Sequence, residues 1–254
     1  MDSTAFYNEY YLKAETSRAH SVFCETVYGK DLCQHGMADI KQIELMIQKL
    51  NLCKTSVFLD LGCGCGAITN YIQTRSDCTA IGIDNSQIAI TNAKKKFNNK
   101  KILFICDDFE NYRYENDKYD AIALIDSHYF IDDLFKLLNR LRLALSKEGR
   151  IAVFSDEGSG IPDIDDSKTK VEETIIGKYL VEQRIPFEGI TLTKENSSHW
   201  KLKKKVLLKM KNDFGDEGNQ MIYKNRLNEC LDHNRNYDSR FLYIIGKNKY
   251  NKYY

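Results

Sequence analysis

The sequence predicts an α/β domain built on a doubly wound, mostly parallel, Rossmann-like sheet, and three observations support this prediction. Short apolar runs alternate with helical patterns between residues 57 and 193. The first run, residues 57–61, is followed at once by Gly62, which is typical of a buried parallel strand. The chain has 254 residues, 43% of them hydrophobic, which is enough for one full core and excludes a disordered protein.

Seven strands follow from the apolar runs, and the core helices follow from the patterns between them. The expected strands are residues 57–61, 79–84, 101–106, 119–125, 149–155, 187–193 and 240–246. The expected helices are residues 67–74, 87–97, 132–146 and 171–183, with Ser86 as the N-cap of the second. Strands that alternate with helices in this way favour parallel pairing with right-handed crossovers.

Two helical segments are additional to this alternation. Residues 1–50 are expected to form an N-terminal helical cover, whose last helix covers residues 37–50. Residues 194–238 are expected to form a helical lid between the last two strands, broken near Gly215 and Gly218. We therefore expect a single domain over residues 1–254, with a core of residues 56–193 and 239–247 and a frayed tail over residues 247–254.

The first lid helix has a distinctive pattern. Ser197 or Ser198 is expected to cap it, and Leu202, Val206 and Met210 recur at every fourth position as an apolar stripe. A lysine-rich face is expected on the other side, formed by Lys201, Lys203, Lys204, Lys205, Lys209 and Lys211.

Composition excludes several classes of protein. The balance of 37 Lys+Arg against 36 Asp+Glu gives a net charge of +1 and argues against a dedicated nucleic-acid binder. The first twenty residues contain Asp2, Glu9 and Glu15, so no secretory leader is expected, and no run reaches the ~18 apolar residues of a membrane span. The eight cysteines form no disulfide framework, and Cys63-x-Cys65 lacks zinc-site spacing. We expect a reduced, cytoplasmic protein without a metal or a membrane partner.

The informative motif is Asp60-Leu61-Gly62-Cys63-Gly64-Cys65-Gly66, which joins the first strand to the following helix. Glycine suits such a turn because the backbone takes unusual torsion angles and approaches a ligand closely. Asp84 closes the second strand, where a carboxylate can accept hydrogen bonds from both ribose hydroxyls. Asp108 and Phe109 follow the third strand, where a carboxylate and an aromatic ring can bind and cover an adenine.

In their order and spacing, four elements resemble the class I S-adenosylmethionine-dependent methyltransferases: residues 57–66, 82–84, 106–109 and 119–120. The resemblance is good over residues 38–156 and holds in outline beyond them. The resemblance implies a seven-stranded methyltransferase sheet and S-adenosyl-L-methionine as cofactor, with S-adenosyl-L-homocysteine as product. Carried over residue by residue, it implies these cofactor contacts: Gly62, Gly64 and Gly66 around the methionine and ribose, Asp60 orienting the loop, Asp84 on the ribose, Asn85 beside the adenine, Asp108 (or Asp107) on the adenine amino group and Phe109 stacked on the ring.

The two helical segments resemble the covers of phosphoethanolamine methyltransferases and of sarcosine/dimethylglycine methyltransferases. This resemblance implies N-methylation of a small polar amine by in-line displacement in a closed pocket. One departure concerns Phe130, which stands where the phosphoethanolamine enzymes place a catalytic histidine, while His128 is two residues away. The expected partner is therefore a small-molecule methyl acceptor, with its identity and the oligomeric state left open.

Further candidate residues lie where the strands end and in the covers. Asp126 is a candidate for both cofactor contact and catalysis, since ligands bind beyond the carboxyl ends of parallel strands. The catalytic candidates besides it are His128, His35 and His199. The substrate candidates are Tyr11, Tyr129, Glu157 and Trp200. Acidic residues after the fifth strand, which include Asp163, Asp165 and Asp166, would suit a cationic substrate or a solvated loop.

Two alternatives stay open at this point. The lysine-rich helix would also suit an RNA methyltransferase, because lysines contact phosphates. Gly62-x-Gly64-x-x-Ala67 also fits the dinucleotide fingerprint of a NAD-dependent oxidoreductase. Tyr114 and Lys118 have the Tyr-x-x-x-Lys spacing of short-chain dehydrogenases, but that pair needs a helix and here lies in a polar turn.

Overall fold

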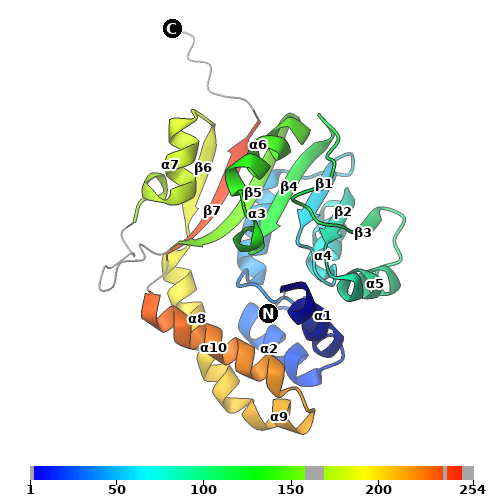
Figure 1. The fold of residues 1–254 in the computed structure, drawn as a ribbon, viewed down its shortest axis with the longest axis vertical. Helices are drawn as coiled ribbons and strands as arrows, with labels where there is room; N and C mark the ends of the chain where they lie inside the picture. Colours follow the sequence, from blue (N-terminus) through cyan, green and yellow to red (C-terminus); the bar gives the residue numbers. More distant parts are fainter. Residues whose placement is uncertain (1–2, 158–168, 237–238, 248–254) are drawn as a thin grey trace.

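The computed structural model describes residues 3–157, 169–236 and 239–247, and its centre is a seven-stranded sheet in the order β3-β2-β1-β4-β5-β7-β6 (Figure 1). The strands β1 to β5 pair in parallel, whereas β7 runs antiparallel to both of its neighbours. The strand bounds are β1 Val57–Leu61, β2 Thr79–Asp84, β3 Ile102–Cys106, β4 Tyr119–Ile125, β5 Leu145–Glu157, β6 Phe187–Thr191 and β7 Ser239–Gly246. The predicted fold class is confirmed.

Alternate residues of the strands form two large apolar cores, one on each face of the sheet, and a third, small cluster surrounds Phe104 of β3. Phe58 of β1 belongs to the core on one face, which also contains residues of α3, α4 and the covers. Its neighbour Leu59 belongs to the core on the other face, which α6 and α7 complete. Both side chains are fully buried. The sheet is thus covered on both faces, as the near-continuous apolar strands require.

The core helices are α4 Ala67–Ser76, α5 Gln87–Lys96, α6 Leu134–Ala144 and α7 Ile175–Glu182. Ser86 caps α5, and its side chain accepts a hydrogen bond from the Ala89 amide at 3.2 Å. The helix expected over residues 132–146 is shorter at both ends, because Asp133 is its N-cap and β5 begins at Leu145. The helix expected over residues 171–183 is a 3₁₀ turn followed by α7, since Thr174 caps the latter.

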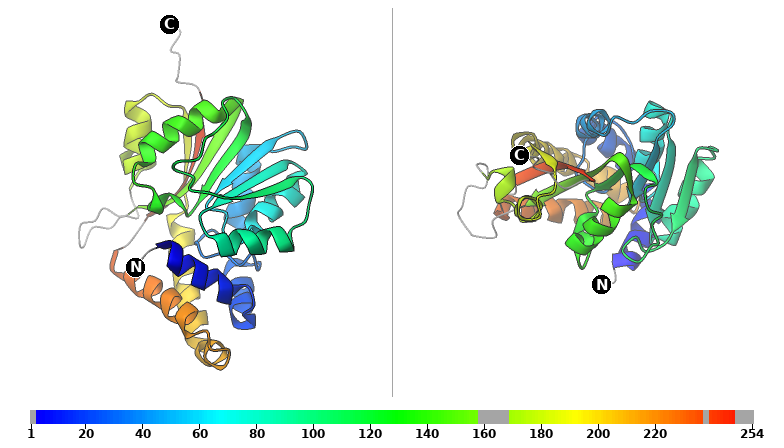
Figure 2. Two further views of the ribbon diagram at one scale, coloured as in Figure 1. Left: turned by 45° about the vertical axis from the view of Figure 1, so that its right-hand side comes forward. Right: turned by 90° about the horizontal axis from the view of Figure 1, so that it is seen from above.

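The first two helices of the N-terminal cover and the lid pack together at one end of the sheet, whereas the third helix, α3, lies against one face of the sheet (Figures 1 and 2). The N-terminal cover consists of α1 Ser3–Ala14, α2 Arg18–Tyr28 and α3 Ile40–Leu50, and the lid consists of α8 Thr193–Lys209, α9 Lys211–Asp216 and α10 Gln220–Asn236. Glu217, between α9 and α10, accepts hydrogen bonds from the Ser17 hydroxyl at 2.6 Å and the Ala19 amide at 2.9 Å. The lid therefore holds the first turn of α2.

The predicted start and faces of the first lid helix were wrong in part. The helix α8 begins at Thr193, so Ser197 and Ser198 lie inside it rather than capping it. Leu202 is 40% exposed, whereas Lys203 is fully buried and its Nζ lies 2.7 Å from a carboxylate oxygen of Glu229 on α10. Val206 and Met210 are buried as predicted, and Lys203 is buried in place of Leu202, because a charged partner on α10 offsets the cost of burying this lysine.

Some predictions fall on residues that the structure does not describe. The acidic residues Asp163, Asp165 and Asp166 and the tail from residue 248 onward lie outside the described ranges. Lys247 is described, and its ammonium group contacts Asp117 and the Leu145 carbonyl. No helix in the described part of the chain is long and apolar enough to cross a membrane. All eight cysteines have free thiols.

Arg240 of β7 ties the edge of the sheet to the strand ends beside it. Its guanidinium, which is fully buried, lies 2.8 Å from Asp126 after β4 and 2.8 Å from Asp156 of β5. It also donates to the side chain of Gln42 on α3 at 2.8 Å. A buried arginine with two carboxylates and an amide has its charge and its donors satisfied.

Replacing Arg240 by methionine should therefore leave two buried carboxylates without their cation. We expect Arg240→Met to lower the free energy of unfolding by roughly 3–5 kcal/mol, the range for breaking a buried ion pair. Urea denaturation monitored by circular dichroism measures this. The control is Arg75→Met, which removes an exposed partner of Glu44 and should have a much smaller effect. Equal effects of the two substitutions would contradict the structural role of Arg240.

Candidate active site

A cavity lies at the carboxyl ends of β1, β2 and β4, between the sheet and the N-terminal cover. Its wall joins the glycine loop after β1 to the residues that end β2 and β4, and α1 and the segment before α3 close it. The lining residues are Tyr7, Tyr11, Leu32, Cys33, Gln34, His35, Gly36, Ala38, Gly62, Cys63, Cys65, Ala67, Ile68, Asp84, Asn85, Asp108, Phe109, Glu110, Ile125, Asp126, Ser127 and Phe130. A ligand there would contact both the sheet and the cover.

The glycine loop requires glycine at Gly62, Gly64 and Gly66, which all have positive φ, and the last two illustrate why. Gly64 has φ +52°, and a Cβ atom on it would lie 2.2 Å from the Tyr11 hydroxyl. Gly66 has φ +74°, and its Cβ would lie 2.4 Å from the Phe104 ring. Positive φ and the absent Cβ together let the backbone turn directly into α4. The Tyr11 hydroxyl occupies the space that a Cβ atom at Gly64 would need, and of the three loop glycines only Gly62 lines the cavity.

Two aspartates hold this loop in place. The Asp60 carboxyl accepts a hydrogen bond from the Thr69 hydroxyl at 2.6 Å and so joins β1 to α4, and burial raises its pKa to about 7. Asp84 accepts hydrogen bonds from the Gly64 amide at 2.8 Å and the Ser86 amide at 2.9 Å. Burial raises the pKa of Asp84 as well, although both amides favour its charged form.

The adenine candidates lie on the same wall. Asp108, Phe109 and Asn85 line the cavity, whereas Asp107 is not among the lining residues. Asp108 accepts hydrogen bonds from the Glu110 amide at 2.9 Å and the Asn111 side chain at 2.6 Å, which fix the turn after β3. Asn85 donates to the Thr4 hydroxyl of α1 at 3.3 Å. Of the two aspartates left open by the sequence, the geometry favours Asp108.

Asp126 lines the cavity, but its carboxylate is already engaged. It accepts hydrogen bonds from the backbone amides of Met37 at 2.7 Å and Ala38 at 2.9 Å, besides its ion pair with Arg240. The Arg240 guanidinium keeps the pKa of Asp126 below its usual value in spite of burial. These contacts describe a carboxylate that positions the cavity wall rather than one that is free to accept a proton.

The three candidate histidines differ in position. Only His35 lines the cavity. The Nε2 atom of His128 lies 3.2 Å from the Ser155 hydroxyl, and the Nδ1 atom of His199 lies 3.8 Å from the Asp39 carboxylate. Burial lowers the pKa of each of the three histidines to about 4, so all three are neutral near pH 7.

The four substrate candidates are also separated. Tyr11 lines the cavity, whereas Tyr129, Glu157 and Trp200 are not among the lining residues. The Tyr129 hydroxyl accepts a hydrogen bond from the Asp156 amide. Glu157 accepts hydrogen bonds from the Tyr243 hydroxyl at 2.9 Å and the Ile175 amide at 2.7 Å. The ring of Trp200 has the Lys203 ammonium 4.3 Å from its centre.

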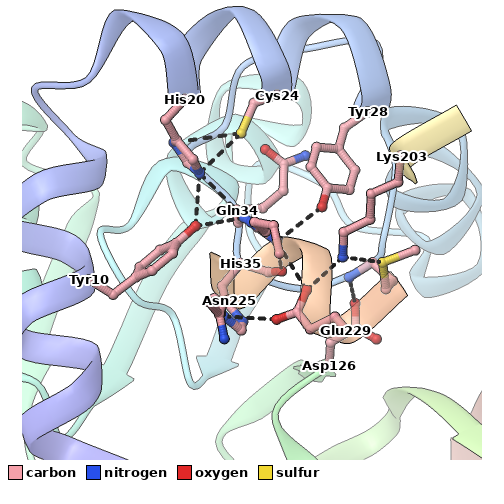
Figure 3. Close-up of polar contacts among 12 residues, drawn as sticks. Tyr10, His20, Cys24, Tyr28, Gln34, His35, Asp126, Lys203, Asn225 and Glu229 are labelled. Carbon is pink, nitrogen blue, oxygen red and sulfur yellow. Dashed lines mark hydrogen bonds and ion pairs between the residues drawn. The ribbon is translucent and has the colours of Figure 1, made fainter. Parts of the chain in front are cut away.

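A buried polar cluster beside the cavity escaped the sequence analysis (Figure 3). Arg226 of α10 is fully buried and donates to the Tyr10 hydroxyl at 2.6 Å, to the Tyr28 hydroxyl at 3.2 Å and to the backbone carbonyls of Gln34 and His35. The guanidinium therefore joins the lid to α1, to α2 and to the segment before α3. Periodicity gives no signal for it, since its buried position depends on partners about 200 residues away.

Fold and site together define a nucleotide-cofactor-binding protein of the Rossmann-like kind, with an acidic wall for the ligand. Among the described residues, no group of three potential metal ligands is close enough to hold an ion. The acidic strand ends, the glycine loop with its small side chains and the aromatic residues Phe109 and Tyr11 fit an adenosyl cofactor with a cationic centre.

Comparison with known proteins narrows this class. Residues 58–149 match the methyltransferase domain family. Malonyl-[acyl-carrier protein] O-methyltransferase of Bacillus anthracis is 34% identical over 103 residues, which are 39% of this chain and 37% of that protein. The chain thus matches well under half the length of this relative. For residues 58–149, this match confirms the predicted resemblance to the class I S-adenosylmethionine-dependent methyltransferases.

Solved structures share the fold at low sequence identity. Phosphoethanolamine N-methyltransferase 2 of Haemonchus contortus, in complex with phosphomonomethylethanolamine and S-adenosylhomocysteine, superposes with a TM-score of 0.65 at 15% identity and covers 95% of this chain and 60% of that one. The cyclopropane synthase MmaA2 of Mycobacterium tuberculosis gives a TM-score of 0.65 at 14% identity, over 96% and 99% of the two chains. Both likenesses extend over the helical covers as well as the core.

The raised pKa of Asp60 predicts a stability effect with a definite sign. Between the ordinary carboxyl pKa of ~4 and the folded value of about 7, only the folded protein keeps this proton, so its stability falls as the pH rises. Asparagine does not titrate. We therefore expect the stability of Asp60→Asn relative to wild type to rise by roughly 2 kcal/mol from pH 5 to pH 8.

Urea unfolding of both proteins at the two pH values measures this difference. Asp77→Asn is the control, because Asp77 is exposed beside Lys101. If wild type and Asp60→Asn differ in free energy of unfolding by the same amount at pH 5 and pH 8, the pKa of Asp60 is not raised.

Proposed function

We propose that this protein transfers the methyl group of S-adenosylmethionine to a small polar acceptor, at an amine nitrogen. The observation that carries the proposal is the charge of the cavity wall. Asp84, Asp108, Glu110 and Asp126 line it, and the described lining residues include no lysine or arginine. A wall of this kind attracts the sulfonium cofactor and an amine and repels an anionic acceptor.

The cofactor would lie along the strand ends. Asp84 would accept from the ribose hydroxyls, Asp108 from the adenine amino group, and Phe109 would stack on the adenine ring, with Asn85 beside it. The methionine part would follow the backbone of the glycine loop at Gly64. S-adenosylmethionine supplies an electrophilic methyl group, so the protein contributes alignment and exclusion of water more than acid–base chemistry.

The acceptor would enter from the side of the covers. The rings of Tyr7 and Phe130 meet edge to face, with centroids 5.5 Å apart, and the ring of Tyr7 also lies 5.1 Å from that of His35. Faces of aromatic rings stabilise cationic groups, which suits both a sulfonium and an ammonium. The absence of lysine and arginine from the described wall disfavours a phosphorylated acceptor, although the phosphoethanolamine enzyme shares the fold.

The RNA alternative loses part of its support. Lys203, one of six lysines on the predicted basic face, is buried against Glu229, and none of the six lines the cavity. An RNA substrate would need a basic path that reaches the transferred methyl group. The small-molecule acceptor therefore remains the function that the cavity supports best.

The test of the cofactor assignment is titration calorimetry with S-adenosylhomocysteine. We expect binding to the wild type and at least a tenfold weaker affinity in Asp84→Asn, which keeps the size of the side chain but not its charge. The loss of charge-assisted hydrogen bonds to two hydroxyls accounts for this magnitude. Asp107→Asn is the matched control and should bind as the wild type does. No binding by the wild type at millimolar ligand would refute the proposed function.

A further inference from the structure

The imidazole of His35 lies between the cavity and the buried cluster of the lid. Its side chain is 19% exposed, and it lines the cavity next to Tyr7 and Gly36. Its Nε2 atom points away from the cavity toward α10, where it lies 3.1 Å from the Asn225 side-chain oxygen and 3.3 Å from a carboxylate oxygen of Glu229 (Figure 3). The two nitrogens of the ring therefore have different surroundings.

The contact with Glu229 determines which nitrogen carries the proton. An ionised carboxylate only accepts hydrogen bonds, so Nε2 must be the N–H donor. Glu229 is ionised, because Lys203 at 2.7 Å and Arg226 at 3.9 Å hold its pKa below the usual range in spite of burial. A ring with one proton, on Nε2, leaves a lone pair on Nδ1.

The Nδ1 atom is available to a ligand. Among the described residues no hydrogen bond reaches it, and it is not one of the buried polar atoms that lack a partner. Since the pKa of His35 is lowered to about 4 by burial, the ring stays neutral near pH 7 and does not hold a second proton. The ring of His35 therefore presents its Nδ1 atom to the cavity as a fixed hydrogen-bond acceptor.

We propose that Nδ1 of His35 accepts a hydrogen bond from the N–H of the methyl acceptor and so aims the nitrogen lone pair at the cofactor methyl group. This proposal rests on the proposed function and names the residue that selects the acceptor. The acceptor reacts as the free amine, after its ammonium proton has passed to solvent. Its nitrogen lone pair forms the new N–CH₃ bond as the S–CH₃ bond breaks, and the electron pair of the broken bond stays on sulfur. The product leaves as an alkylammonium ion, and His35 remains neutral throughout.

The lid supplies the orientation of this ring. Asn225 and Glu229 come from α10, and Lys203 from α8 holds the carboxylate in place. A histidine whose far nitrogen is bound in this way has a fixed tautomer and a fixed ring plane. The acceptor would therefore be a molecule with a hydrogen-bond donor on the methylated atom, such as a primary or secondary amine, and a tertiary amine would be a poor substrate.

Two substitutions separate the functions of the two ring nitrogens. His35→Gln places an amide N–H near the Nε2 position and removes the Nδ1 acceptor. His35→Asn places an oxygen near the Nδ1 position and gives up the contact with Glu229. Methyl transfer from radiolabelled S-adenosylmethionine is measured with ethanolamine, glycine, sarcosine and dimethylglycine as probes, of which only the last is a tertiary amine.

We expect His35→Gln to lower kcat/KM for the best probe roughly 10- to 100-fold, the effect of one hydrogen bond, while His35→Asn retains activity within about fivefold of wild type. Both variants should bind S-adenosylhomocysteine as the wild type does. Equal activity of the two variants, or dimethylglycine as the best probe, would overturn the proposal.

A second measurement does not depend on finding the acceptor. Nitrogen-15 NMR of the protein saturated with S-adenosylhomocysteine at pH 7 reports the tautomer of each histidine, and the His35 signals are those missing from His35→Gln. We expect a protonated Nε2 and an unprotonated Nδ1, and the opposite tautomer would overturn the proposal. Absence of S-adenosylhomocysteine binding would instead refute the proposed function.

Discussion

The wall of the cavity depends on how one short segment, residues 34–38, is held between the two halves of the molecule. From the lid, the Arg226 guanidinium donates to the carbonyls of Gln34 and His35. From the core, the Asp126 carboxylate accepts from the amides of Met37 and Ala38. An irregular segment cannot pair its own backbone N–H and C=O groups as a helix does. Here a buried cation binds the carbonyls on one side, and a buried anion binds the amides on the other.

Such an arrangement explains why charges that are costly to bury lie in this region. Arg226, Arg240 and Lys203 are fully buried, and each has a carboxylate partner. When both members of a buried ion pair are replaced by hydrophobic residues of similar volume, the stability of a protein is often unchanged. Removing one member alone is costly. Ion pairs of this kind are therefore better understood as fixing one arrangement of the chain. Here they fix the position of the segment relative to both lid and core. Although the sequence has nearly equal numbers of positive and negative residues, these three cations lie inside the protein rather than on its surface.

The sequence predicted what local rules determine and missed what distant contacts determine. The strands β1, β2 and β4, the cap Ser86 and the glycine loop depend on neighbouring residues, and the structure has them where they were expected. The burial of Lys203 depends on Glu229, which lies 26 residues further along. In the same way, the sequence placed His128 and Trp200 with His35 as site candidates, because periodicity does not tell which side chains reach one cavity.

The two walls of the cavity are formed by different elements of the fold. The parallel strands and the glycine loop form the wall for the nucleoside, and these parts obey rules shared by all such sheets. The covers form the opposite wall, and only His35 and the tyrosines of α1 bring chemistry to it. Because Glu229 and Asn225 hold the His35 ring from behind, a change in the packing of α10 against α1 would turn the ring without touching the cofactor wall. On the proposed function, different elements of the fold would therefore set the specificity for the acceptor and the affinity for the cofactor.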